Sequence, residues 1–121
     1  TFLYDSHCYM LYTATATWSD AKSVCDNSSS TLLTINSEEE RTHLTDIMIS
    51  SFPSLPQVWT GLNDIAVEGN PVWLTGDHPI YNDYDHEPGT DSEGKDCFQI
   101  SASDRSLRHA DCQLEFGYIC E

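Results

Sequence analysis

The sequence predicts a single small domain that combines two helices with several short strands. Two segments carry apolar residues at helical spacing, and four others are short runs rich in β-branched and aromatic residues. A length of 121 residues suffices for one hydrophobic core and is small enough to gain from disulfides. We therefore expect residues 1–121 to form one domain, without a repeat or a linker.

The first predicted helix covers residues 17–25, because three residues share one apolar face: Trp18, Ala21 and Cys25. The polar run 26–30 ends it. The second helix starts at a capping box, in which the Ser37 hydroxyl accepts from the backbone N–H of Glu40 and the Glu40 carboxylate reaches back. It extends to about residue 50, before the proline-containing run 52–56. Its inward-facing residues are Leu44, Ile47 and Met48.

Short strands are predicted at residues 57–62, 72–74, 97–100 and 117–120, and residues 32–35 form a further β-prone run. Between the middle strands, residues 76–96 are polar and rich in Gly, Pro, Asp and Asn. A long irregular segment inside a compact domain usually carries function or is anchored by an ion or ligand. The sequence therefore places the functional region here.

The charge balance restricts the class of partner. The chain has 20 acidic and 5 basic residues, a formal net charge of −15. Nucleic acid and anionic membrane surfaces would be repelled, so neither is expected as a partner. A cationic ligand, a bound divalent cation and simple solubility all remain compatible with this charge. No apolar stretch approaches the roughly 20 residues of a membrane span, and the first residues do not read as a signal peptide, which suggests a mature or excised segment.

Five cysteines without a Cys-x-x-Cys pair favour disulfides over zinc, and hence a secreted protein or the extracellular domain of a cell-surface protein. The glycosylation sequon at Asn27 fits that setting. Two bridges among five cysteines allow about fifteen pairings. The odd cysteine, Cys8, either lacks its partner, bridges to another chain in a dimer, or is free.

Read in order, nearly the whole chain resembles the C-type lectin-like domain. The matching residues are Cys8-Tyr9, Trp18-x-x-Ala21-x-x-x-Cys25, Leu32 and Ile35-x-Ser37-x-x-Glu40, Trp59-Thr60-Gly61-Leu62-Asn63-Asp64, Trp73-Leu74-Thr75-Gly76, Glu87-Pro88, Asp96-Cys97, Cys112 and Tyr118-Ile119-Cys120-Glu121. The resemblance implies an α+β, C-type lectin-like fold: two helices packed on antiparallel sheets, with a long loop region. It also implies the disulfides Cys25–Cys120 and Cys97–Cys112, and tryptophans at core positions.

Sugar-binding members of that family hold a calcium ion that coordinates sugar hydroxyls, and this chain departs from their ligand set. Glu87 matches a ligand position, but Gly89 stands where the family has Asn and Lys95 where it has Glu. Leu107-Arg108-His109 replaces the Trp-Asn-Asp motif. Calcium requires six to eight oxygen ligands, so we expect no calcium at this primary site. We hypothesise that Lys95 or Arg108 pairs with Glu87 instead.

An auxiliary calcium position of the family is better preserved. Its ligands map to Asp64, Glu68, Asp96 and the residue after Gly89, which is Thr90 here with Asp91 one step further. Calcium at this auxiliary site is one reading, and a solvated acidic loop is the other. A third position maps to Ser37, Glu39, His43 and Glu121. There Glu39 can simply complement the helix dipole, without a metal.

These departures favour a non-catalytic recognition domain that binds a protein ligand through its long-loop face. Candidate ligand-binding residues are Tyr84, His86, Glu87, Lys95 and Arg108, although the aromatic ones could also be ordinary loop anchors. A glycan-binding lectin with a nonstandard or auxiliary-calcium site is the alternative. Mineral or ice binding lacks a periodic carboxylate array, and no catalytic triad or dyad has a distinctive signature. We therefore expect no enzymatic activity.

Overall fold

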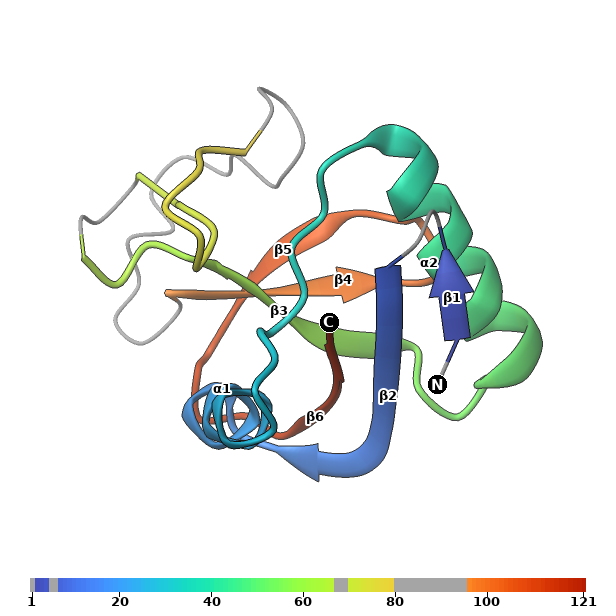
Figure 1. Cartoon of the computed structure of the whole chain (residues 1–121), viewed down its shortest axis with the longest axis horizontal. Helices are drawn as coiled ribbons and strands as arrows, with labels where there is room; N and C mark the ends of the chain where they lie inside the picture. The colour runs from blue at the N-terminus through green and yellow to red at the C-terminus, as the bar shows by residue number, and fades with distance from the viewer. Residues whose placement is uncertain (1, 5–6, 67–69, 80–95) are drawn as a thin grey trace.

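The computed structural model describes residues 2–4, 7–66, 70–79 and 96–121. A sheet of six strands is ordered β1-β2-β6-β3-β4-β5 (Figure 1). Neighbouring strands run antiparallel except β3 and β6, which are parallel. The strands are β1 (Phe2–Tyr4), β2 (His7–Ala16), β3 (Gln57–Asn63), β4 (Cys97–Ser101), β5 (Leu107–Ala110) and β6 (Phe116–Cys120).

Both predicted helices are present. Helix α1 (Trp18–Asn27) is capped by Thr17, and α2 (Glu38–Ser51) is capped by Ser37, whose hydroxyl accepts from the Glu40 N–H at 3.1 Å. The Glu40 carboxylate reaches back one residue further than a standard capping box, because Oε1 accepts from the backbone N–H of Asn36 at 2.6 Å. Its other oxygen accepts from the buried Tyr9 hydroxyl, which ties the start of α2 to β2.

The helices cover opposite faces of the sheet. Residues that alternate along β4 separate into two clusters: Phe98 and Ile100 pack with Leu44 and Met48 of α2, whereas Cys97 packs with residues of α1. All three tryptophans are buried, as expected. Two of them also bond across elements, with the Trp18 Nε1 donating to Thr60 O and the Trp59 Nε1 to Ala16 O, each at 2.8 Å.

Two disulfides close the fold in the pairing that the resemblance implied. Cys25–Cys120 joins α1 to β6, and Cys97–Cys112 joins the start of β4 to the loop after β5. Cys8 on β2 is an exposed free thiol. Neither helix has the length and apolar character needed to cross a membrane, within the part of the chain that the structure describes.

Some predicted elements differ from the observed ones. Residues 72–74 are not a strand, because Val72 alone pairs, in an isolated bridge with Asn63. Residues 32–35 are also not a strand, although Leu33 bonds to Ile119 O and its own carbonyl accepts from Gly61. A Cβ at Gly61 would lie 3.0 Å from the Leu32 carbonyl oxygen, so this segment crosses β3 at a close approach that a side chain would crowd. The strands β1, β2 and β5 were not predicted, and Ile47 is only half-buried.

Candidate functional site

The ends of β3 and β4 bring two predicted metal-ligand residues together. Asn63 pairs with Cys97 in the sheet, and just beyond this pair the Asp64 N–H donates to the Asp96 carbonyl at 2.9 Å. Asp64 is 2% exposed and Asp96 is half-buried. The segment 70–79 returns to the same edge, because Asn63 and Val72 exchange backbone hydrogen bonds of 3.0 and 2.8 Å. In Figure 1 this segment lies at the upper left, away from α2.

Strand β5 carries the described residues of the primary position. Leu107 is buried in the core, and the His109 ring packs on Phe98 with ring centroids 4.3 Å apart. Arg108 forms an ion pair with Asp104, and its Nε donates to Ser106 Oγ at 2.8 Å. In the described chain, Arg108 therefore pairs with Asp104. Its hypothesised partner Glu87 lies outside the described residues, as do Tyr84, His86 and Lys95.

The turn between β4 and β5 has its own electrostatic network. The Ser106 hydroxyl donates to Asp104 Oδ1 at 2.7 Å, and the Ser106 backbone N–H donates to the same oxygen at 3.1 Å. These bonds, the Ser106 hydroxyl first, lower the pKa of Asp104 below its ordinary value; burial opposes them, and Arg108 adds to the lowering. The sequence reasoning missed this network. The Asp-x-Ser spacing at 104–106 is typical of a side-chain-to-backbone turn and could have revealed it.

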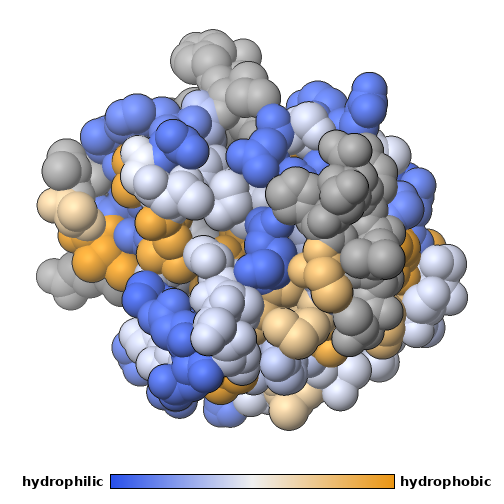
Figure 2. Space-filling model, in the orientation of Figure 1, coloured by the Kyte–Doolittle hydropathy of each residue, from blue (hydrophilic) through white to orange (hydrophobic). Residues whose placement is uncertain are grey.

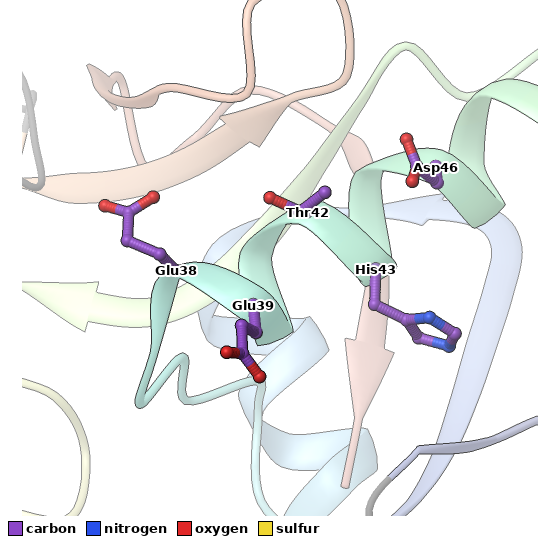
Figure 3. Close-up of a pocket in the computed structure, with 5 residues that line it drawn as sticks. All are labelled: Glu38, Glu39, Thr42, His43 and Asp46. Carbon is purple, nitrogen blue, oxygen red and sulfur yellow. The ribbon is translucent and has the colours of Figure 1, made fainter.

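The structure describes all four residues of the third predicted calcium position. Ser37 serves as the helix cap, and Glu121 Oε1 accepts from the Thr34 N–H at 2.6 Å, which fastens the last residue to the loop before α2. Glu39 and His43 instead lie along α2 with other polar side chains (Figure 3). No three His, Cys, Asp or Glu side chains that the structure describes are placed to share a metal ion. Asn27 is exposed at the end of α1, as a glycosylation site requires.

A sequence profile of the lectin C-type domain matches residues 14–121. The chain belongs to the C-type lectin domain family. The low affinity immunoglobulin epsilon Fc receptor of Homo sapiens is 30% identical over 116 residues, which cover 94% of this chain and 34% of the receptor. Lectin BRA-3 of Megabalanus rosa is 30% identical over 122 residues, covering 98% of this chain and 72% of that lectin. The chain thus spans about a third of the receptor and most of the lectin.

Solved structures agree with this assignment. The crystal structure of a calcium-independent type II antifreeze protein has a TM-score of 0.83 and 25% sequence identity, and the match covers 98% of this chain and 88% of that one. The fold of this C-type lectin domain is therefore shared with a protein described as calcium-independent.

Calcium is the metal that the C-type lectin family implies. The described residues of the primary position and those of the auxiliary position differ in whether their side chains suit calcium. At the primary position, Arg108 and His109 offer a cation and a ring nitrogen where calcium requires oxygen, so these residues do not fit. At the auxiliary position, the backbones of Asp64 and Asp96 are hydrogen-bonded to each other, and carboxylates are ligands of the chemistry that calcium requires. The other two auxiliary residues, Glu68 and Asp91, lie outside the described residues.

Proposed function

We propose that this C-type lectin domain is a non-catalytic extracellular recognition module that binds a protein ligand through its long-loop face, without a calcium-bridged sugar contact. The observation that carries the proposal is the β5 strand, where Arg108 is engaged by Asp104 and Ser106 at a position that holds calcium in sugar-binding relatives. The Arg108 guanidinium offers no oxygen ligand to calcium, and its side chain remains about half exposed beside Asp104, so an acidic group of a protein can still reach it. Tyr84, His86, Glu87 and Lys95 are the other proposed contact residues.

The test compares glycan and protein binding with and without calcium. We expect the domain to give no calcium-dependent signal on a glycan array, and to bind at least one member of a panel of purified ectodomains in excess EDTA. Arg108→Ala should abolish the binding, whereas Lys22→Ala, which removes an exposed cation on α1, should not. Calcium-dependent glycan binding by the unmodified domain would refute the proposal.

The alternative is a glycan-binding lectin that uses the auxiliary calcium position. It is supported by the backbone hydrogen bond between Asp64 and Asp96, which brings two residues with carboxylate side chains to the same edge of the sheet. Binding of calcium to the native state must raise its unfolding midpoint. If millimolar calcium raises the unfolding midpoint of the domain and Asp96→Asn removes this rise, the alternative is favoured. An unfolding midpoint that calcium does not change would exclude a tight calcium site.

We further propose that the domain acts outside the cell, as the disulfides suggest, and that Cys8 can join two copies. The thiol is exposed on β2, so a second chain can reach it. Protein secreted by eukaryotic cells should run as a dimer on non-reducing gels and as a monomer after reduction. Cys8→Ser should run as a monomer in both, and a monomeric unmodified protein would contradict the covalent dimer.

A further inference from the structure

The outward side of α2 presents a continuous stripe that changes from acidic to apolar along the helix. Glu39, Thr42, Asp46 and Ile49 are all exposed and recur at intervals of three and four residues, so they lie on one face. At 1.5 Å per residue the stripe is about 15 Å long. The long-loop face and its candidate contact residues are not part of it.

The N-terminal half of the stripe is an open, carboxylate-rich surface. A shallow depression of about 380 Å³ is lined by five side chains that follow one another along α2: Glu38, Glu39, Thr42, His43 and Asp46 (Figure 3). Hydrophilic side chains gather over this end of α2 at the upper right of Figure 2. Glu38 faces Arg41 at 3.6 Å but is 74% exposed, and no ion pair holds Glu39 within the described chain. Asp46 is already paired with Arg105, so Glu38 and Glu39 are the carboxylates that favour a cationic group of a partner.

The C-terminal half is an apolar cavity of about 220 Å³ between the end of α2 and the β4–β5 turn. Its lining includes Ile49, Phe52, Leu55 and Ala102, and the Ile49 side chain is 52% exposed. Small-molecule sites usually have about 300–1,000 Å³, so this cavity is better matched to one apolar side chain of a larger partner.

The β4–β5 turn holds the two halves in a fixed arrangement. Arg105 reaches from this turn to α2, where its guanidinium donates to Thr42 O at 3.0 Å and Thr45 Oγ1 at 2.8 Å and pairs with Asp46 at 2.6 Å. The neighbouring residues Ala102 and Ser103 line the apolar cavity. The surface is therefore preorganised, which lowers the entropy that binding must overcome.

We propose that this face of α2 docks a basic, amphipathic segment of a protein partner. A basic side chain of the segment lies over Glu38 and Glu39, and an apolar side chain enters the cavity beside Ile49. Charge complementarity selects this occupant, because the whole chain carries −15 and would repel an anionic membrane. This docking surface shares no residue with the proposed contact residues of the long-loop face, so substitutions can test the two proposals independently.

The experiment measures fluorescence anisotropy of a labelled peptide of about 14 residues, built from Lys and Leu as an amphipathic helix. We expect saturable binding that weakens with added salt. Glu39→Lys should weaken it by about tenfold or more, whereas Glu115→Lys, an exposed control with the same change of net charge, should stay within about twofold. Ile49→Ser should weaken it several-fold, and the equally exposed control Leu114→Ser should not.

Three results would overturn the proposal. The first is the absence of saturable binding to this peptide. The second is equal weakening by Glu39→Lys and Glu115→Lys, which would mean non-specific attraction to the overall charge. The third is a change in the mass of the peptide-free protein, by light scattering, when Ile49 becomes Ser, since the cavity would then be a contact between copies of this chain. Circular dichroism of each variant verifies that the fold is retained.

Discussion

At the scale of single residues, the carboxylate of Glu40 connects the capping of a helix to the core. It is 4% exposed and accepts from the Tyr9 hydroxyl on one oxygen and from the Asn36 N–H on the other. Burial of a carboxylate is costly unless hydrogen bonds compensate it. Both bonds come from segments that precede α2, so this one side chain fixes where the helix begins relative to β2.

Tyr9→Phe should therefore destabilise the domain by about 1–3 kcal/mol, because the buried Glu40 carboxylate loses a donor that nothing replaces. Tyr12→Phe is the matched control, since the half-buried Tyr12 ring stacks on Tyr118 with centroids 4.8 Å apart. Tyr12→Phe should lower the free energy of unfolding by less than about 0.5 kcal/mol. Urea unfolding of both variants measures the difference, and equal losses would show that Glu40 does not depend on the Tyr9 hydroxyl.

Asn27 should carry an N-linked glycan when the domain is made in the eukaryotic secretory pathway. Residues 26–29 are all exposed at the end of α1, so the sequon is accessible to the transferase. A glycosidase should reduce the mass of the secreted protein, and Asn27→Gln or Ser29→Ala should abolish this change. A protein of unmodified peptide mass from such cells would contradict the prediction.

At the scale of elements, the β4–β5 turn combines an unfavourable backbone conformation with side-chain contacts to α2. Arg105 has φ of +60°, a left-handed conformation that is unfavourable for a residue with a side chain. Its guanidinium is nevertheless held by three groups of α2. The contacts with the helix thus compensate the backbone strain and keep the turn against α2.

Two substitutions separate these opposing effects. Arg105→Ala retains the strain and loses the contacts, so the domain should become less stable than the unmodified one. Arg105→Gly loses the same contacts without the strain and should be more stable than the alanine variant by about 1 kcal/mol. Guanidinium unfolding of the three proteins tests this order. An alanine variant as stable as the glycine variant would show that the turn relaxes.

The Asp104 network predicts a specific pH response. The lowered pKa of Asp104 means that its stabilising contribution is present above its unfolded value, near about 3.9, and is lost as pH falls through the folded pKa. Ser106→Ala removes the first cause of the lowering, so the pKa of Asp104 should rise. NMR titration of the carboxyl carbon measures it, with Ser103→Ala as a control because Ser103 bonds to Ser101 instead. An unchanged pKa would mean that the backbone N–H of residue 106 and Arg108, rather than the Ser106 hydroxyl, lower it.

The elements differ in how well local sequence predicts them. The helices were predictable because local sequence determines both their N-caps, Thr17 and Ser37, and the spacing of their apolar residues. The strand β2 was missed although residues 8–12 are all apolar or aromatic, because that run does not alternate with polar residues and residues 13–16 are only Thr and Ala; β5 has only four residues. The opposite error occurred at 32–35. That run reads as a strand, but its backbone bonds go to distant segments that local sequence cannot reveal.

The site was predictable only as far as the resemblance reached. The resemblance assigned Asp64 and Asp96 to the same calcium position. The two residues are adjacent in space, although the long loop separates them in sequence. The resemblance did not predict that Glu121 would bond to Thr34, because that contact depends on how the last strand meets the loop before α2. Which candidate ligands lie close together therefore depends on the tertiary structure, and the residue types in the sequence do not determine it.

At the scale of the whole molecule, the proposed loss of calcium chemistry can be tested by reversing it. A variant with Gly89→Asn, Lys95→Glu, Arg108→Asn and His109→Asp restores the oxygen ligands of the family. It should bind calcium, with an unfolding midpoint that rises in calcium and returns with EDTA. The unmodified domain should show no such rise from its primary site. If the restored variant also fails to respond, the loop geometry rather than these four side chains prevents binding.

The central strands also determine when the domain can form during synthesis. Strand β6 is the last strand, yet it lies between β2 and β3, and its Cys120 bridges to Cys25 across 95 residues. Contacts of such long sequence separation make folding slow. While the chain is translated, β2 and β3 have no strand between them, and Cys25 lacks its native partner Cys120. The nascent domain should therefore engage chaperones and disulfide isomerases until its final residues emerge, and then acquire its tertiary structure in one late, cooperative step.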